Sequence, residues 1–196
     1  MRWRSLSQSA LSHPDPPPSR ERKVYTIGHS TRSLQEFIEL LRLSQIELLI
    51  DVRTVPRSRR FPHFNSEAPA RTLREYAVHY RHLKELGGLR KPAPNSLNTG
   101  WRNLSFRGFA DYMQSQVFRR GLEDALHCAT KRRTVLVCAE AVPWRCHRSL
   151  IADALLLKQA EVLHIVSASD VRNHNLTPFA VIQENRLTYP QPGSML

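Results

Sequence analysis

Between residues 24 and 166 the chain alternates five short strand-like runs with segments of helical periodicity, and this alternation limits the fold more than any other feature. A run that is nearly all apolar, such as Ile46–Ile50, is typical of a parallel strand buried on both faces. Strands that alternate with helices predict a parallel sheet with helices on both faces. We therefore expect a single α/β domain with a mostly parallel sheet of about five strands. The expected strands are Val24–Ile27, Ile46–Ile50, His79–Leu83, Thr134–Cys138 and Val162–Val166.

Helical segments separate these strands. Ser33 and Glu36 have the spacing of a capping box, and apolar residues follow at helical spacing, which predicts a helix from Ser33 to about Ser44. Further helices are expected over 69–78, over 106–131 with a break near Gly121, and over 146–159.

The two ends of the chain lack this periodicity. Residues 1–23 are basic and rich in Pro, which predicts a disordered tail. The α/β domain is expected over residues 24–170. Residues 171–196 are expected to form an irregular C-terminal extension, with one short strand near Val181.

Charge and cysteine content limit the partners and the compartment. The formal net charge is +12, of which residues 1–23 contribute only +3, so the folded part is itself basic. A basic domain attracts polyanions, so we expect an anionic small molecule or a nucleic acid as partner. No apolar run is long enough to span a bilayer, the amino terminus lacks a secretory signal, and three cysteines make no disulfide framework. These features predict a cytoplasmic protein without a membrane partner.

Three polar clusters follow three of the predicted strands, at 28–30, 51–53 and 138–148. The carboxyl ends of parallel strands share one edge of a sheet, which is where open α/β proteins bind ligands. We therefore expect the three clusters to converge on one site.

Five residues of these clusters are candidates for chemistry. Glu140 and His29 can transfer protons, although Glu140 can instead form an ion pair with Arg145 or Arg148. Asp51 can orient Arg53 or His29, or cap a turn. Cys146 and His147 precede a predicted helix and can shape or activate the site. The candidate catalytic residues are Glu140, His29, Cys146, His147 and Asp51.

Other residues are candidates for substrate binding. Arg148, on the first helical turn, can bind an anion together with backbone N–H groups, or can be a solvated charge. The segment from Arg53 to Phe64 mixes arginines with aromatic residues, which can grip a phosphate backbone or form a solvated basic loop. The candidates are Ser30, Arg53, Arg57, Arg59 and Arg148.

The cysteines permit three kinds of chemistry. Cys146 lies beside cationic groups that favour a thiolate, so it can be a nucleophile. Cys138 and Cys146 can form a redox pair, although the compartment disfavours a permanent bond. Cys128, Cys138, Cys146 and His147 are possible zinc ligands, but their spacings do not match those of structural zinc sites. We therefore expect no metal and no cofactor.

Four motifs taken together resemble the DUF488 family, a group of uncharacterised soluble α/β proteins. They are Tyr25-Thr-Ile-Gly-His-Ser30, Leu49-Ile-Asp-Val-Arg53 with Pro56-x-Ser58, Tyr80-x-x-Leu83 with Leu86-Gly-Gly88, and Cys138-x-Glu140-x-x-Pro143-x-x-Cys146-His-Arg148. The resemblance covers about residues 24–166 and implies the same fold and the same site, to which it adds Tyr80 as a binding residue. It implies no particular reaction.

A weaker resemblance links Ile50-Asp-Val-Arg53 and the strand before Cys138 to rhodanese-type sulfurtransferases. In those enzymes, and in Cys-dependent phosphatases, a cysteine opens an anion-binding loop that an arginine closes. Here the sixth residue after Cys138 is Trp144, and Arg145 follows one position later. The spacing therefore departs from the phosphatase pattern.

The leading interpretation is an enzyme that acts on a nucleotide, a nucleic acid or another phosphorylated substrate. One alternative is a nucleic-acid-binding module without catalysis. Another is a rhodanese-like or redox thiol enzyme that uses Cys146 or Cys138.

Overall fold

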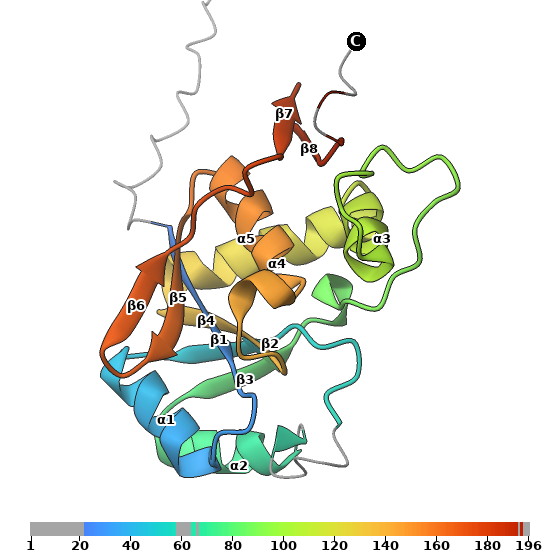
Figure 1. Cartoon of the computed structure of the whole chain (residues 1–196). Coiled ribbons are helices and arrows are strands. Elements are labelled where there is room, and N and C mark those ends of the chain that lie inside the picture. The colour runs from blue at the N-terminus through green and yellow to red at the C-terminus, as the bar shows by residue number, and fades with distance from the viewer. Residues whose placement is uncertain (1–21, 58–63, 66, 192, 194–196) are drawn as a thin grey trace, which may run out of the picture.

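The structure is a computed structural model, and it describes residues 22–57, 64–65, 67–191 and 193. Its main feature is a six-stranded sheet in the order β3-β2-β4-β1-β5-β6 (Figure 1). The first five strands run parallel and β6 is antiparallel to β5. The predicted fold class, a mostly parallel α/β sheet, is confirmed. The strands are β1 (Lys23–Gly28), β2 (Leu48–Asp51), β3 (His79–His82), β4 (Thr134–Cys138), β5 (Glu161–Ser167) and β6 (Asp170–Asn173).

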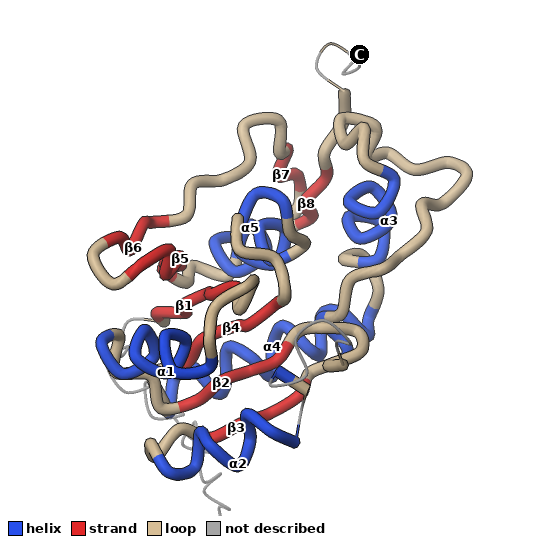
Figure 2. The backbone as a smooth tube through the Cα atoms, turned by 60° about the horizontal axis from the view of Figure 1, so that its bottom comes forward, coloured by secondary structure: helices blue, strands red, loops and turns tan. Residues whose placement is uncertain are grey.

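Helices cover both faces of the sheet, as the sequence predicted (Figure 2). One apolar cluster joins one sheet face to α1 and α2, through residues such as Phe37 and Leu73. A second joins the opposite face to α3, α4 and α5, through Phe109, Phe118 and Leu150. The helices are α1 (Leu34–Leu43), α2 (Glu67–Glu75), α3 (Leu104–Tyr112), α4 (Gln116–Lys131) and α5 (Arg148–Leu157), with 3₁₀ turns η2 (Lys84–Leu86) and η3 (Pro143–Arg145).

Alternation along the central strand β4 decides which side chains reach the site. Val135 and Val137 pack into the cluster under α1 and α2, whereas Leu136 and Cys138 pack into the cluster under α5. Successive side chains of a strand point to opposite faces, so this pattern is fixed once the apolar residues are buried. It places the Cys138 thiol on the same side as the amino end of α5.

The capping box predicted for α1 is present. The Ser33 hydroxyl accepts a hydrogen bond from the Glu36 backbone N–H, and the Glu36 carboxylate accepts one from the Ser33 backbone N–H. Two of the unpaired N–H groups at the helix start are thereby satisfied.

The break in the long helical stretch does not lie near Gly121, where the sequence led us to expect it. It falls at 113–115, where Ser115 caps α4 by accepting a hydrogen bond from the Phe118 N–H. Gly121 lies inside α4. A glycine is needed there because a Cβ would approach the Glu85 Cβ to 2.8 Å. This glycine serves close packing against η2.

The segment after Asp170 is more ordered than we expected. It contains β6, which joins the sheet, and a hairpin of β7 (Val181–Gln183) and β8 (Arg186–Thr188). Leu187 and Tyr189 are buried in the core under α5. Long-range packing, which the sequence pattern does not reveal, orders this segment.

The expectations for the N-terminal tail and for membrane-spanning helices are addressed only in part by the described residues. The predicted tail lies outside the described residues except for its last two, and the second of these, Lys23, begins β1. None of the helices in the described part of the chain has both the length and the apolarity needed to cross a bilayer.

The connections around β1 and β4 open a crevice at one edge of the sheet. These two strands are neighbours, and Gly28 pairs with Cys138 at their carboxyl ends. The chain leaves β1 through α1 on one face and leaves β4 through α5 on the other. A point where successive connections diverge in this way is the usual ligand site of an open α/β sheet.

Candidate functional site

A pocket of about 720 Å³ lies at this edge of the sheet. Its walls come from the ends of β1, β2 and β4, from the turn after η2, and from the start of α3. The described lining residues are His29, Ser30, Thr31, Arg53, Thr54, Val55, Arg57, Gly88, Leu89, Ser105, Phe106, Cys138, Ala139, Glu140, Arg145, Cys146 and His147.

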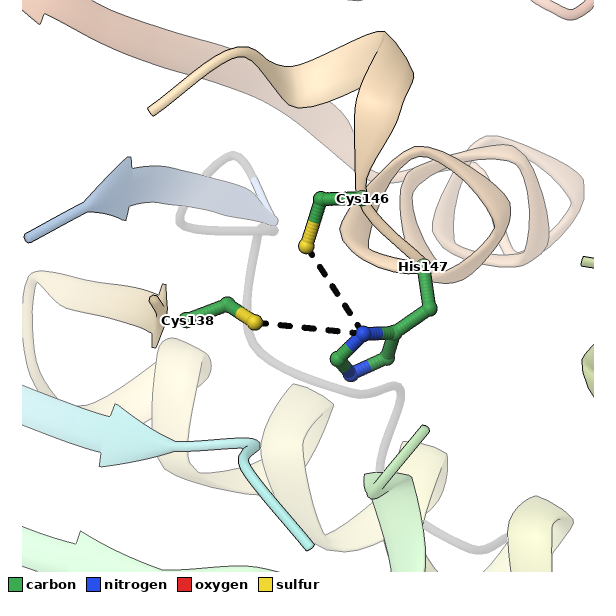
Figure 3. A group of neighbouring side chains, drawn as sticks. All are labelled: Cys138, Cys146 and His147. Carbon is green, nitrogen blue, oxygen red and sulfur yellow. Dashed lines mark hydrogen bonds between the residues drawn. The ribbon is translucent and has the colours of Figure 1, made fainter. Parts of the chain in front are cut away.

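Two thiols and an imidazole meet in the pocket wall formed by β4 and the start of α5 (Figure 3). The Sγ atoms of Cys138 and Cys146 lie 3.9 Å and 3.7 Å from Nδ1 of His147. Both cysteines are buried and neither forms a disulfide. Cys128 on α4 is outside this group, and its Sγ accepts a hydrogen bond from Arg81.

The two thiols influence each other's acidity. A hydrogen bond from Cys138 lowers the pKa of Cys146 well below its usual value, helped by His147 and by the positive charge of Arg148. The same hydrogen bond, together with burial, raises the pKa of Cys138 well above its usual value.

A second group, on the α1 side, is organised by Asp51. This carboxylate is fully buried and accepts hydrogen bonds from the Arg53 backbone and guanidinium, with one Nη2–Oδ2 distance of 2.5 Å, and from the Tyr80 hydroxyl at 2.9 Å. Burial by itself lowers the pKa of Arg53, but the Asp51 carboxylate outweighs it and the net shift is upward. Burial and the Asp51 charge also raise the pKa of Tyr80. Arg53 lines the pocket whereas Asp51 and Tyr80 do not, so these two residues lie behind the pocket wall.

His29 supports Arg53 in the same group. Its ring stacks on Phe64 at a centroid distance of 4.3 Å, and its Nε2 lies 3.3 Å from the Arg53 Nη1. A guanidinium can only donate, so Nε2 accepts, and the proton on Nδ1 is donated to the Ser30 carbonyl at 3.1 Å. The basic nitrogen of His29 is therefore already occupied by Arg53.

Arg148 does not line the pocket, which differs from our expectation of an anion-binding residue on an exposed first turn. Its side chain is fully buried, donates to the Glu140 carbonyl at 2.5 Å and lies 3.3 Å from the Thr26 hydroxyl. Nε of Arg148 is one of two buried side-chain nitrogen or oxygen atoms in the described residues without a hydrogen-bond partner. Burial among sheet, loop and helix turns this arginine into a support for the loop after β4.

The exposed charges of the pocket lie around its rim. Arg57 and Arg145 are exposed and approach from the β2 side and the α5 side, while Glu140 is the one exposed carboxylate in the described lining. The Glu140 carboxylate accepts a hydrogen bond from the next backbone N–H, and no ion pair with Arg145 or Arg148 is present. The rim therefore has a net positive charge.

Two lining residues have a strained backbone. Ser30 has a φ of 48° and Leu89 a φ of 59°, both in the left-handed region that L residues rarely adopt. Leu89 is also 82 % exposed.

The structure brings most of the predicted site residues into one pocket. Asp51, Tyr80 and Arg148 lie behind its walls, and Arg59 is outside the described residues. The predicted residues that line the pocket are His29, Ser30, Arg53, Arg57, Glu140, Cys146 and His147.

Sequence reasoning missed several lining residues. Ser105 and Phe106 come from the start of α3, and no local pattern pointed to them. Gly88 had a signal, the Gly87-Gly88 pair, but its reason is visible only in the structure. A Cβ on Gly88 would lie 3.0 Å from Nδ1 of His147.

Comparison with known proteins gives one result. A family model described as "Domain of unknown function DUF488" matches residues 33–155, well over half of the chain. A search of curated proteins and a search of solved structures each returned no match. The comparisons therefore do not support the weaker rhodanese-type resemblance.

Proposed function

The chain belongs to the DUF488 family, and from this premise we propose that it is an enzyme acting on a nucleotide, a nucleic acid or another phosphorylated substrate. One observation carries the proposal: a single pocket joins three arginines to a Cys–His–Cys group, formed by Cys138, His147 and Cys146, whose two thiols are buried. The arginines are Arg53, Arg57 and Arg145.

The size and the charge of the pocket suit a phosphorylated ligand. A volume of about 720 Å³ is within the usual range for small-molecule sites, roughly 300–1,000 Å³. Guanidinium groups bind phosphate oxygens through paired hydrogen bonds. Arg57 and Arg145 are exposed and not paired with Glu140, so their charge is available to a ligand, whereas Asp51 neutralises Arg53.

We assign different roles to the residues around the pocket. Arg57 and Arg145 bind the anion. Arg53 provides a fixed wall because Asp51 and His29 hold its guanidinium, and Tyr80 in turn donates to Asp51. Glu140 is exposed at the rim, where a carboxylate can accept a proton from water or from the substrate. The Cys–His–Cys group is the reactive centre. His29, first expected to transfer protons, becomes a positioning residue, and Asp51 is the orienting residue for Arg53.

Calorimetric titration with phosphorylated ligands tests the binding step. The probes are inorganic phosphate, a nucleoside monophosphate and a short single-stranded oligonucleotide. Charge-assisted hydrogen bonds are each worth about 1.5–3 kcal/mol, so Arg57→Ala combined with Arg145→Ala should weaken binding by at least about a hundredfold. Arg120→Ala removes an exposed arginine of α4 outside the pocket and should have no effect. Equal affinity in both variants would contradict the proposal.

The reactive centre separates an enzyme from a binding module. Glu140→Gln and Cys146→Ser should retain ligand binding but abolish turnover of a phosphate ester or an oligonucleotide. A nucleic-acid-binding module without catalysis predicts salt-sensitive oligonucleotide binding in every variant that keeps its arginines, and turnover in none of them.

A further inference from the structure

We propose that Cys138, Cys146 and His147 form a binding site for a thiophilic divalent cation, of which Zn²⁺ is the best match. The site belongs to the same pocket, so the inference rests on the proposed function and specifies its reactive centre. It reverses our expectation from the sequence, where the ligand spacing argued against a metal. Spacing failed as a guide because tertiary structure brings the three residues together.

The two Sγ atoms and His147 Nδ1 lie near the separations that a tetrahedrally coordinated ion needs. The two Sγ atoms and His147 Nδ1 all lie within 4.8 Å of one another, and the two sulfur–nitrogen distances are 3.9 Å and 3.7 Å. With Zn–S near 2.3 Å and Zn–N near 2.0 Å, a tetrahedron separates its donor atoms by about 3.5–3.8 Å. The two sulfur–nitrogen distances are therefore within a few tenths of an ångström of the tetrahedral value, and the two sulfur atoms, at most 4.8 Å apart, need to approach by no more than about 1 Å.

The orientation of His147 favours ligation through Nδ1. Its Nε2 lies 3.1 Å from the Val52 carbonyl oxygen, which can only accept, so Nε2 carries the ring proton. The lone pair of Nδ1 then points toward both sulfur atoms (Figure 3). A metal-binding histidine usually donates its other ring N–H to a carbonyl or carboxylate in this way.

Packing holds the imidazole in this position. Phe109 contacts the ring in an edge arrangement at a centroid distance of 5.0 Å, and Gly88 lies close enough to His147 that a Cβ would crowd Nδ1. Cys138 ends a central strand and Cys146 is the C-cap residue directly after η3, so both thiols come from ordered backbone. The donor set is therefore preorganised, which reduces the entropic cost of binding.

The charges of the site suit a divalent cation. Metal binding releases the protons of both thiols to solvent, and the resulting two thiolates with a neutral imidazole bring a charge of −2, which a divalent cation cancels. The neutral complex is compatible with the buried guanidinium of Arg148 close by. Soft thiolate ligands together with imidazole select zinc over magnesium or calcium, which prefer oxygen ligands.

The site leaves one coordination position open. All three donor residues line the pocket, so the fourth position faces the space where the substrate is proposed to bind. Three protein ligands and one exchangeable position are typical of catalytic zinc, whereas structural zinc has four protein ligands. An ion there supplies a Lewis acid for a phosphoryl oxygen and lowers the pKa of a bound water.

Titration with Co²⁺ and Zn²⁺ tests the inference. Reduced, metal-free protein should bind one equivalent of Co²⁺ and show thiolate-to-cobalt charge transfer, and Zn²⁺ should displace it. Cys138→Ser, Cys146→Ser and His147→Gln should each weaken binding by roughly a hundredfold or more. Cys128→Ser removes a cysteine outside the group and should bind like the unchanged protein. Absence of stoichiometric binding, or equal loss in Cys128→Ser, would overturn the proposal.

A second measurement does not depend on the variants folding. In the unchanged protein, alkylation followed by mass spectrometry should find Cys138 and Cys146 protected by Zn²⁺ and released by a chelator, with Cys128 modified equally in both cases. Modification that Zn²⁺ does not slow, or a Cys138–Cys146 disulfide in place of metal binding, would refute the site. Binding of the phosphorylated probes is measured on metal-free protein, so failure of the metal site and failure of the proposed function give different results.

Discussion

At the scale of single residues, the main feature of the site is how it accommodates buried charge. Asp51 is fully buried, and four donor groups, three from Arg53 and one from Tyr80, satisfy its carboxylate. Breaking a buried ion pair leaves an uncompensated charge, which costs much more than breaking a surface pair. The pair therefore keeps Arg53 rigid at the pocket wall.

Asp51→Ala should lower the free energy of unfolding by about 3–5 kcal/mol, because it leaves the Arg53 guanidinium buried without a counter-charge. Urea denaturation measures the change. Asp124→Ala is the matched control, since it breaks the exposed ion pair between Asp124 and Arg81 and should cost at most about 1 kcal/mol. Similar losses in the two variants would show that the buried pair does not stabilise the fold.

At the scale of elements, the pocket depends on how closely the carboxyl ends of β1 and β4 approach. The backbone N–H groups of His29 and Ser30 donate to the carbonyls of Cys138 and Ala139, which extends the β1–β4 contact into the loops. Gly28 permits this approach, because a Cβ there would lie 1.9 Å from the Glu140 carbonyl oxygen. That carbonyl also accepts the Arg148 hydrogen bond. The close approach that Gly28 permits therefore brings β1, the loop after β4 and α5 together.

Gly28→Ala should therefore destabilise the protein by about 3 kcal/mol through overpacking against backbone that cannot move aside. Ser30→Gly, two residues later, should leave stability unchanged or raise it slightly, since glycine adopts the positive φ of Ser30 without strain. Thermal unfolding of both variants measures the difference. A Gly28→Ala protein as stable as the Ser30→Gly protein would contradict the close approach.

At the scale of the whole molecule, a chain of polar groups links Arg148, which supports the loop after β4, to the C-terminal segment. Thr26 Oγ1 lies 2.7 Å from His164 Nδ1, His164 Nε2 lies 3.0 Å from His174 Nδ1, and His174 Nε2 lies 2.8 Å from Asp153 Oδ1. Arg148 can only donate to Thr26, so one consistent assignment runs Arg148 to Thr26 to His164 to His174 to Asp153. In this assignment both histidines are neutral, and each donates from Nε2.

This chain predicts a loss of stability in mild acid. Burial, His174 and Arg148 lower the pKa of His164 to about 4 from an ordinary value of 6.5. The unfolded chain then binds a proton between pH 6.5 and 4 that the folded chain does not, so stability falls as pH falls through this window. The neutral state of His164 thereby contributes about 3 kcal/mol to the free energy of unfolding. This contribution is complete above pH 6.5 and absent below pH 4.

His164→Gln removes the titrating group and should flatten the dependence of the unfolding free energy on pH between 6.5 and 4. The slope is the measurement, because the substitution also changes stability at every pH. His79→Gln, which changes an exposed histidine of β3, should retain the slope of the unchanged protein. Parallel curves for the His164→Gln and unchanged proteins would exclude His164 as the source.

The sequence by itself determined the elements whose signals are local. Four of the five parallel strands follow from short apolar runs, and the start of α1 follows from the Ser33–Glu36 capping box. The convergence of the clusters after β1, β2 and β4 follows as well, because parallel strands place their carboxyl ends at one edge. These predictions depend only on nearest neighbours along the chain or on the direction of the strands.

Only the tertiary structure decided what each site residue does. Arg148 is buried and does not line the pocket. The basic nitrogen of His29 accepts a hydrogen bond from Arg53. The Val52 carbonyl accepts from Nε2 of His147, so that Nδ1 faces the thiols. Residues far apart in sequence impose each of these outcomes, so no local pattern encodes them. The spacing of Cys138, Cys146 and His147 along the chain did not reveal that their side chains meet, because the fold, and not the spacing, sets the distances between their Sγ and Nδ1 atoms.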